Sequence, residues 1–259
     1  MSVCVQNLNF SYTKKRVLKG VDFCVDSGQL VCLLGPNGVG KSTLFRCILG
    51  LLRGYSGAAY IDGQDIGRLS PKQLARLVAY IPQSHAPAFN YSVLDMTLMG
   101  TTPQLSAFVT PGKREIDLAE AALARLDILH LRDRSFLHTS GGEQQLVLIA
   151  RALAQQAKVL VMDEPTANLD YGNQIRVLDQ VKALSKNGYT IIQSTHHPDQ
   201  AFLYADVVLA MMDGKILAKG SPQQIINAGL IRDLYGVDVI VHSLFEDSVR
   251  VCIPRSVVS

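Results

Sequence analysis

The segment "GPNGVGKST", residues 35–43, constrains the fold more than any other part of the chain. It follows the continuous apolar run 29–35 ("QLVCLLG"), which predicts a strand covered on both faces. It precedes a helix that we expect from Lys41 to about Leu52. A glycine-rich turn between a buried strand and a helix lets backbone N–H groups surround phosphate oxygens. The fixed positions of the motif G-x-x-x-x-G-K-[ST] are all present: Gly35, Gly40, Lys41 and Ser42.

This loop predicts a nucleotide site with defined roles for two side chains. Lys41 would reach the β- and γ-phosphates, and the hydroxyl of Ser42 would bind Mg²⁺. The alternative is an ordinary glycine turn with a lysine by chance, which the strand–loop–helix context disfavours. By itself, however, the loop fits a kinase, a GTPase or a motor equally well.

Strand and helix patterns alternate along most of the chain, which predicts a largely parallel sheet. Between about residues 86 and 140 helical periodicity replaces the strand signals and indicates a helical insertion. Further strands are expected at 21–25, 58–63, 78–83, 158–165 and 189–197, helices at 70–77, 142–155 and 169–186, and a hairpin at 205–220 around Asp213-Gly214. The last forty residues predict a helix from 222 and two short strands within 238–254.

The composition fits a soluble globular enzyme. Of its 259 residues 48% are apolar, 18% charged and 7% aromatic. A chain of this length can bury a sufficient hydrophobic core for one large α/β domain or for two small ones. A net charge of +3 is too small to argue for nucleic acid. No apolar run approaches the roughly 18 residues of a membrane span, and the start lacks a signal-peptide core. We therefore expect a cytosolic or peripheral protein.

The five cysteines, Cys4, Cys24, Cys32, Cys47 and Cys252, are scattered and include no CxxC pair. An odd number without a pattern is typical of buried small apolar residues in a reducing compartment. We therefore expect neither a disulfide framework nor a metal site.

Two carboxylates follow the apolar strand 158–162. Asp163 and Glu164 stand at its C-terminal end, the edge of an α/β sheet at which ligands bind. Asp163 is placed to hold Mg²⁺, and Glu164 to reach a water that attacks the γ-phosphate. Without the phosphate loop, a solvated acidic turn before Pro165 would be the better interpretation.

A second glycine motif, "TSGGEQQL" at 139–146, begins the helix expected from residue 142. Its bare N–H groups and the helix N-terminus attract anions, as the phosphate loop does. The alternative is a simple helix-start turn. One chain with two such phosphate-binding devices, a hundred residues apart, needs an explanation.

The order of these motifs resembles the ATP-binding cassette (ABC) ATPases over essentially the whole chain. The motifs are Tyr12, residues 35–43, Gln83, residues 140–144, Asp163 with Glu164, "NLD" ending at Asp170, and His196. The resemblance implies a P-loop NTPase of the α/β class: a mixed, largely parallel core sheet, an N-terminal antiparallel β subdomain and a helical insertion subdomain. It implies one domain over 1–259, with a core at about 1–85 and 150–220, a helical signature subdomain at 86–149 and an appendage at 221–259.

The resemblance also implies the role of each motif residue, with ATP and Mg²⁺ as cofactors. Glu164, His196, Lys41 and Gln83 would be catalytic, and Ser42, Gln83 and Asp163 would bind the metal. Tyr12 would stack on adenine. The residues implied to contact ATP are Tyr12, Gly35, Pro36, Asn37, Gly38, Val39, Gly40, Lys41, Ser42, Thr43, Ser140, Gly141, Gly142, Glu143 and Asp170.

Members of this family work as head-to-tail pairs, which would explain the second glycine motif. The signature helix of one chain covers the γ-phosphate held by the loop of the other, so two motifs in one chain imply two chains around two ATP. Thr139 and Glu143 depart from the usual signature residues, yet the Ser140 hydroxyl and the glycine N–H groups remain. His197 we interpret as exposed and not catalytic.

Within the family, "VLDMTLMG" (93–100) and the tail 229–241 resemble the ATPase subunits of iron-chelate, haem and cobalamin importers. The resemblance implies a second copy of the chain, membrane permease subunits and a solute-binding protein as partners, no nucleic acid, and a place on the cytoplasmic face of the membrane. An oxyanion or metal-ion importer stays open as an alternative, because "GTTPQLSAF" (100–108) departs from the subfamily pattern. So do a non-transport ABC protein acting on DNA or ribosomes and a P-loop kinase.

Overall fold

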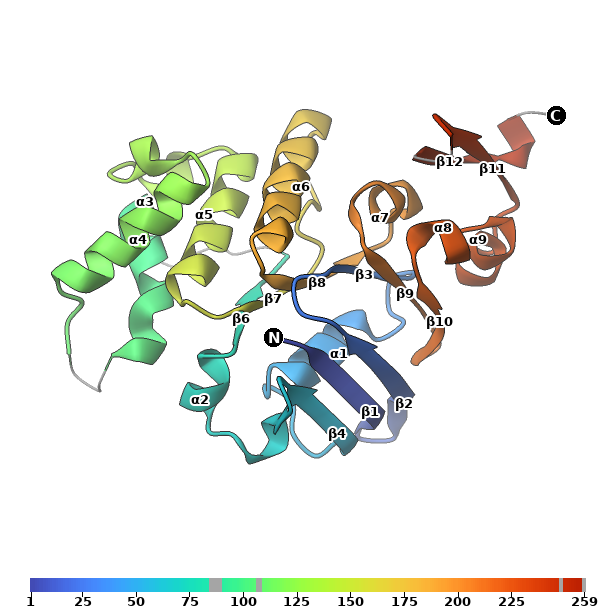
Figure 1. Cartoon of the computed structure of the whole chain (residues 1–259), viewed down its shortest axis with the longest axis horizontal. Helices are drawn as coiled ribbons and strands as arrows, with labels where there is room; N and C mark the ends of the chain where they lie inside the picture. The colour runs from blue at the N-terminus through green and yellow to red at the C-terminus, as the bar shows by residue number, and fades with distance from the viewer. Residues whose placement is uncertain (84–89, 106–108, 247–248, 258–259) are drawn as a thin grey trace. The chain divides into compact units, whose positions relative to one another are not determined.

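The computed structural model describes residues 1–83, 90–105, 109–246 and 249–257. The chain forms two compact units, which we describe separately. Unit 1 consists of residues 1–68 and 188–259, and unit 2 of residues 69–187 (Figure 1). The division of the chain into core, helical subdomain and appendage stays a prediction.

Unit 1 begins with an antiparallel sheet whose strand order is β2-β1-β4-β5. Its apolar residues alternate, so that Val21, Phe23 and Val25 lie buried while Asp22 and Asp26 face solvent, as predicted. The sheet confirms the predicted N-terminal antiparallel β subdomain. Its strands are β1 (Val3–Tyr12), β2 (Lys15–Val25), β4 (Ser56–Ile61) and β5 (Gln64–Asp65).

The second sheet of unit 1 has the order β10-β9-β3-β8. Strand β3 (Leu30–Leu34) is buried along its whole length and pairs in parallel with β8 (Thr190–Thr195) and β9 (Val207–Met212). The hairpin from β9 to β10 (Lys215–Gly220) supplies the antiparallel edge. The mixed, largely parallel α/β sheet is thus confirmed.

Helix α1 (Lys41–Ile48) is shorter than predicted. Leu49 ends it, and Gly50 follows with a φ of 66°, a left-handed conformation that closes helices at glycine. The apolar residues up to Leu52 continue the helical pattern in sequence only.

The C-terminal part of unit 1 contains the predicted helix and two strands. Buried side chains of α7, α9 and β11, among them Phe202, Ile231 and Val239, form one cluster with residues of β3 and β9. The elements are α7 (Pro198–Tyr204), α8 (Pro222–Ile225), α9 (Ala228–Tyr235), β11 (Val239–Leu244), β12 (Val249–Pro254) and a 3-10 turn (Arg255–Val257).

Unit 2 combines two parallel strands with the predicted helical segment (Figure 1). Helix α2 lies within the predicted range 70–77, with Ser70 as its cap and Pro71 at its first position. Gly100 allows the close approach of two helical segments, because a Cβ there would lie 1.9 Å from the Arg151 carbonyl oxygen. The strands are β6 (Val78–Ile81) and β7 (Val159–Met162). The helices are α2 (Pro71–Ala75), α3 (Val93–Leu98), α4 (Lys113–Arg125), α5 (Gly141–Ala154) and α6 (Tyr171–Lys186), with a 3-10 helix over Met99–Gln104.

The expectation of five unpaired cysteines was wrong. Cys4 on β1 and Cys24 on β2 stand directly opposite each other in the antiparallel register and form a disulfide. Cys32 and Cys47 are buried thiols, as expected, and Cys252 is partly buried. The sequence did not predict the pairing, because the two cysteines are 20 positions apart without a recognisable pattern, and only the strand register brings their side chains together.

Among the described residues, every helix is too short or too polar to cross a lipid bilayer.

Candidate active site

The phosphate loop connects β3 to α1 in unit 1. Gly35 leaves no room for a side chain, because a Cβ there would lie 2.3 Å from the carbonyl oxygen of Met211. Gly38 and Gly40 have φ angles of +83° and +113°, which favour glycine. The three glycines therefore let the backbone curl tightly at the start of α1.

Lys41 lies on the inner side of this loop. Its side chain is only 5% exposed, and Nζ donates hydrogen bonds to the carbonyl oxygens of Gly35 (2.6 Å) and Pro36 (3.4 Å). Ser42, the next residue, is exposed, and the first turn of α1 carries no acidic side chain. The ammonium group and the positive end of the helix together provide an environment for an anion.

His196 lies at the same sheet edge as this loop. β3 and β8 are adjacent parallel strands, and the N–H of Gly35 donates to the carbonyl oxygen of Thr195 (3.3 Å). The carbonyl oxygen of His196 accepts a hydrogen bond from Tyr235 Oη (3.1 Å), which ties the end of β8 to α9. The structure thus brings His196 and the phosphate loop together. His197 is exposed, as expected, with its ring 4.1 Å from that of His196.

Tyr12 ends β1 and presents its ring to solvent. It is 39% exposed and makes an edge contact with Phe10, with ring centroids 4.9 Å apart. An exposed ring face supported from one side suits stacking on a planar base.

Unit 2 holds the carboxylates and the glutamine. Asp163 is 8% exposed, and its N–H donates to the carbonyl oxygen of Ile81 (2.9 Å). Glu164 has a φ of 46°, an uncommon left-handed conformation for a non-glycine residue. Gln83, which follows β6, places Nε2 3.4 Å from Glu164 Oε2. The parallel pairing of β6 and β7 therefore brings the predicted glutamine and glutamate together.

The residues predicted to hold Mg²⁺ have suitable donor atoms. Mg²⁺ takes oxygen ligands, usually one or two from the protein, with substrate phosphates and waters supplying the rest. Asp163 offers a carboxylate, Ser42 a hydroxyl and Gln83 an amide oxygen. This donor set fits the ion.

The signature segment forms a capping box at the start of α5. Ser140 Oγ accepts from the N–H of Glu143 (3.3 Å), and the Glu143 carboxylate accepts from the N–H of Ser140 (2.7 Å). That second hydrogen bond is the main cause of the lowered pKa of Glu143. Ser140 and Gly141 are exposed, so this helix N-terminus faces solvent. Glu143 itself is occupied by the cap, which is a structural reason for an acidic residue at this position.

The departure at Thr139 has a local explanation. The side chain is buried, and its hydroxyl donates to the carbonyl oxygen of Phe136 (2.7 Å). The amide of Gln144 donates to the same carbonyl and to that of Thr139 (both 3.2 Å). These bonds hold the turn that precedes the two glycines.

Gly142 packs against the segment around Asp170. A Cβ on Gly142 would lie 2.2 Å from Asn173 Oδ1. Asn173 in turn donates to the Asp170 carboxylate through its N–H (2.9 Å) and its side-chain amide (2.7 Å), and these bonds lower the pKa of Asp170. The glycine motif and Asp170 are thus joined through Asn173, a residue that the sequence analysis missed. The spacing from a helix-capping aspartate to its third following residue would have indicated it.

This contact predicts a strong effect of Gly142→Ala. The added methyl group must displace Asn173 from Asp170, and we expect ATP hydrolysis to fall by roughly 10- to 100-fold, the scale of an ångström misplacement in an active site. A steady-state ATPase assay measures it. Gly172→Ala is the matched control, because its Cβ would meet Asp170 Oδ1 at an ordinary 3.6 Å. Equal rates in both variants would contradict a role for this contact.

The site geometry agrees with the chain's similarity to known proteins. A family model described as ABC transporter matches residues 18–167. An uncharacterized ABC transporter ATP-binding protein of Haemophilus influenzae is 48% identical over 205 residues, covering 79% of this chain and 78% of the relative. A Helicobacter pylori protein named "Probable iron chelatin transport ATP-binding protein" is 35% identical over 94% of this chain and 96% of its own.

The fold of the whole chain also matches a solved structure. A metal-chelate type ABC transporter in an inward-facing conformation matches with a TM-score of 0.86 and 29% identity, over 99% of both chains. The chain therefore belongs to the ABC transporter family, as an ATPase whose activity is coupled to transport.

Proposed function

We propose that this chain is the ATP-hydrolysing subunit of a membrane importer for a metal chelate, such as an iron–siderophore, haem or cobalamin, and that it works as a head-to-tail dimer around two ATP. The observation that carries the dimer is the exposed, capped N-terminus of α5 at Ser140 and Gly141, which offers a second position for an anion besides the phosphate loop. The names of the iron chelatin relative and of the metal-chelate transporter support the cargo.

In this proposal the loop residues 35–43 hold the phosphates of ATP, and Tyr12 stacks on adenine. Lys41 exchanges its contacts to the Gly35 and Pro36 carbonyl oxygens for the β- and γ-phosphates. Such charge-assisted hydrogen bonds are about twice as strong as neutral ones. Asp163, Ser42 and Gln83 would hold Mg²⁺, which neutralises charge on the phosphates when bound.

Glu164 would act as the base that takes a proton from the attacking water. The Gln83 amide, already beside Glu164, would orient that water, and His196 would stabilise the γ-phosphate from the end of β8. The signature residues Ser140 and Gly141 of the second chain would cover the γ-phosphate. The helix N-terminus carries about half a positive charge, which opposes the phosphate's negative charge.

The proposed partners are permease subunits at the cytoplasmic face of the membrane, fed by a solute-binding protein. The test is affinity purification of the chain from detergent-solubilised membranes, followed by mass spectrometry. The proposal expects a polytopic membrane protein in the eluate and ATPase activity stimulated by a binding protein loaded with a metal chelate. Stimulation by molybdate or a free metal ion instead would support the alternative importer class, and recovery of ribosomes or DNA would overturn the proposal.

Helix α3 and the 3-10 turn after it provide the expected contact to the permease. Val93 and Met96 are fully buried in unit 2, whereas Leu94 and Leu98 are half-buried and Met99 is 38% exposed. These outer apolar residues suit a groove for a short amphipathic helix. Residues 84–89, between Gln83 and this helix, lie outside the described part of the chain.

Met99→Glu should uncouple transport from hydrolysis. A charge at this exposed apolar position weakens docking without disturbing the buried side chains, and loss of one buried apolar contact of about 1.5–3 kcal/mol weakens binding roughly 10- to 100-fold. The isolated subunit should keep its basal ATPase rate, while the reconstituted transporter should lose substrate-stimulated turnover and uptake. Leu51→Glu, which places the same charge at an exposed apolar position after α1, serves as the comparison. Normal uptake by Met99→Glu would exclude this residue from the docking surface.

A further inference from the structure

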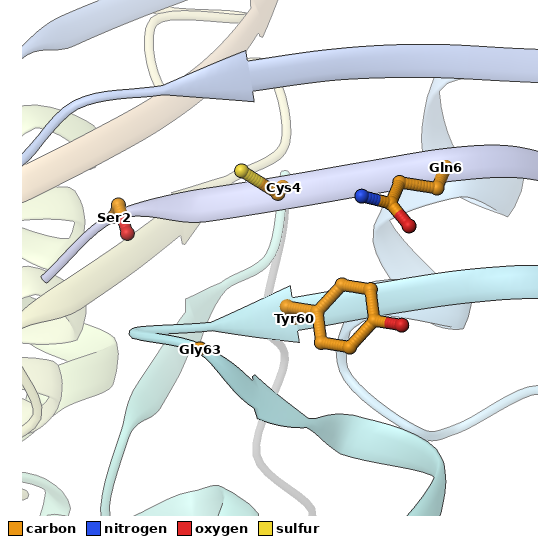
Figure 2. A pocket seen from close by; sticks show the side chains of 5 residues that line it. All are labelled: Ser2, Cys4, Gln6, Tyr60 and Gly63. Carbon is orange, nitrogen blue, oxygen red and sulfur yellow. The ribbon is translucent and has the colours of Figure 1, made fainter.

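The Cys4–Cys24 disulfide lies on the exposed face of the N-terminal sheet. A pocket of about 280 Å³ lies beside Cys4 (Figure 2). Cys24 is exposed and Cys4 is partly buried. The lining residues come from β1, from β4 and from the segments just outside them, and are Ser2, Cys4, Gln6, Tyr60 and Gly63. A disulfide with solvent access and an adjacent pocket is open to attack, unlike one enclosed in a core.

The strand register places the pocket on the side of Cys4 opposite to Cys24. Cys4 pairs with Cys24 on β2 and with Tyr60 on β4, so the three residues form one row across the sheet. Thiol–disulfide exchange requires the incoming sulfur to approach along the line of the S–S bond, from behind the sulfur attacked. For attack on Cys4, that approach runs through the pocket.

The lining chemistry indicates what the pocket takes. Its side chains supply the hydroxyl of Ser2, the amide of Gln6 and the hydroxyl of Tyr60, which can hydrogen-bond amide and carboxylate groups. The volume lies just below the usual range for drug-sized ligands, about 300–1,000 Å³. We propose that this pocket is an exchange site at which a small peptide-like thiol opens the Cys4–Cys24 disulfide.

The exchange balances without a further reagent. The thiolate of the small molecule attacks Cys4 Sγ, the S–S bond breaks, and the electron pair leaves on Cys24 Sγ, which takes a proton from water. A second small thiol then attacks the sulfur of the adduct and releases Cys4 as a thiol. Two small thiols are oxidised to one small disulfide, and the protein disulfide is reduced to two thiols. The reverse sequence closes the bond.

One cation lies beside Cys24, whose sulfur leaves in this exchange. Lys219 Nζ donates a hydrogen bond to the Cys24 carbonyl oxygen, which brings an ammonium group next to this residue. The neighbouring carboxylate of Asp22 accepts from the N–H of Asn7 (2.7 Å), which offsets part of its negative charge. Asp26 lies on the same exposed face, and its carboxylate opposes a thiolate there, so the approach path and not the local charge selects Cys4 for attack.

The first test uses reduced glutathione on the full chain, purified without reductant and kept folded. Alkylation with iodoacetamide and peptide mass spectrometry then count the opened thiols. We expect Cys4 and Cys24 to become alkylated, while the buried Cys32 and Cys47 stay unmodified. A pair that opens only in denaturant would overturn the proposal.

The second test separates the pocket from simple exposure. Cys24→Ser and Cys4→Ser are each treated with glutathione disulfide, and the rate of mixed-disulfide formation is measured on the remaining cysteine. Exposure alone favours Cys24, whereas a pocket that binds glutathione beside Cys4 should make Cys4 react faster than Cys24 despite its lower exposure. Faster modification of Cys24 would contradict the pocket's role.

A pocket-filling variant completes the design. Gln6→Trp, made in the Cys24→Ser background, should slow adduct formation on Cys4 several-fold, because the indole occupies the approach path. His242→Trp, at an exposed position of β11, is the matched control and should leave the rate unchanged. Thermal melting verifies that both variants are folded, and equal rates in both would count against the proposal.

Discussion

Lys41→Ala is expected to abolish ATP turnover. Lys41 is the only basic residue of the segment 35–43, and its buried Nζ lies against the loop carbonyl oxygens where the phosphates are proposed to bind. Hydrogen bonds to charged groups contribute about 1.5–3 kcal/mol, so the dissociation constant of ATP should rise roughly 10- to 100-fold. Loss of a cation that stabilises the transition state should lower the rate by a further factor of about 10².

The measurements are ATP binding by isothermal titration calorimetry and steady-state hydrolysis. Because Lys41 also bonds the loop carbonyl oxygens, a thermal melt must show that the variant is folded. Lys113→Ala, at the exposed start of α4, controls for the loss of a positive charge. Wild-type rates of ATP hydrolysis in the Lys41→Ala protein would contradict the assignment of residues 35–43 as the ATP-binding loop.

Glu164→Gln should retain ATP and lose hydrolysis. Removing a positioned general base lowers the rate by about 10²–10⁴-fold, whereas the amide has the same shape and does not repel the phosphates. The Gln83 amide also keeps a partner, because an amide oxygen at position 164 can still accept. With hydrolysis stalled, we expect a dimer that holds ATP to accumulate.

Size-exclusion chromatography with light scattering, with and without ATP, measures that dimer. Glu246→Gln, which removes an exposed carboxylate from the turn after β11, is the control and should hydrolyse ATP normally. If the Glu164→Gln protein hydrolyses ATP at the wild-type rate, Glu164 is not the general base and another residue must take the proton. One that stays monomeric with ATP while the wild type dimerises would contradict the head-to-tail pair.

The fold was largely predictable because its local signals agree with its packing. The apolar run before Gly35 is a fully buried strand, Ser70 and Pro71 start a helix, and the hairpin turns at Asp213. Helix ends were less predictable, because they depend on single backbone conformations. Gly50 has a φ of 66°, a left-handed conformation, and α1 therefore ends early although the apolar pattern continues in the sequence.

Some residues of the candidate site could also be predicted from the sequence, and others could not. The glycines, Lys41 and the two carboxylates could be identified from sequence, since each occupies a fixed place relative to a strand end. For Asn173 the spacing from Asp170 indicates only a helix-capping contact, whereas its packing against Gly142 appears only in the fold. The Cys4–Cys24 bond could not be predicted, since two bulged strands must pair in one particular register to create it.

If one complete ATP site is shared by two chains, mixing two chains with different defects should restore it. One chain carries Lys41→Ala and the other Gly141→Asp, which adds a negative charge at the exposed signature turn; both also carry Glu164→Gln to prevent hydrolysis. Native mass spectrometry with ATP counts the nucleotides in each dimer. We expect little dimer from either chain alone, and a mixed dimer that holds one ATP between the intact loop of one chain and the intact signature of the other. Absence of that mixed, singly loaded dimer would contradict the shared site.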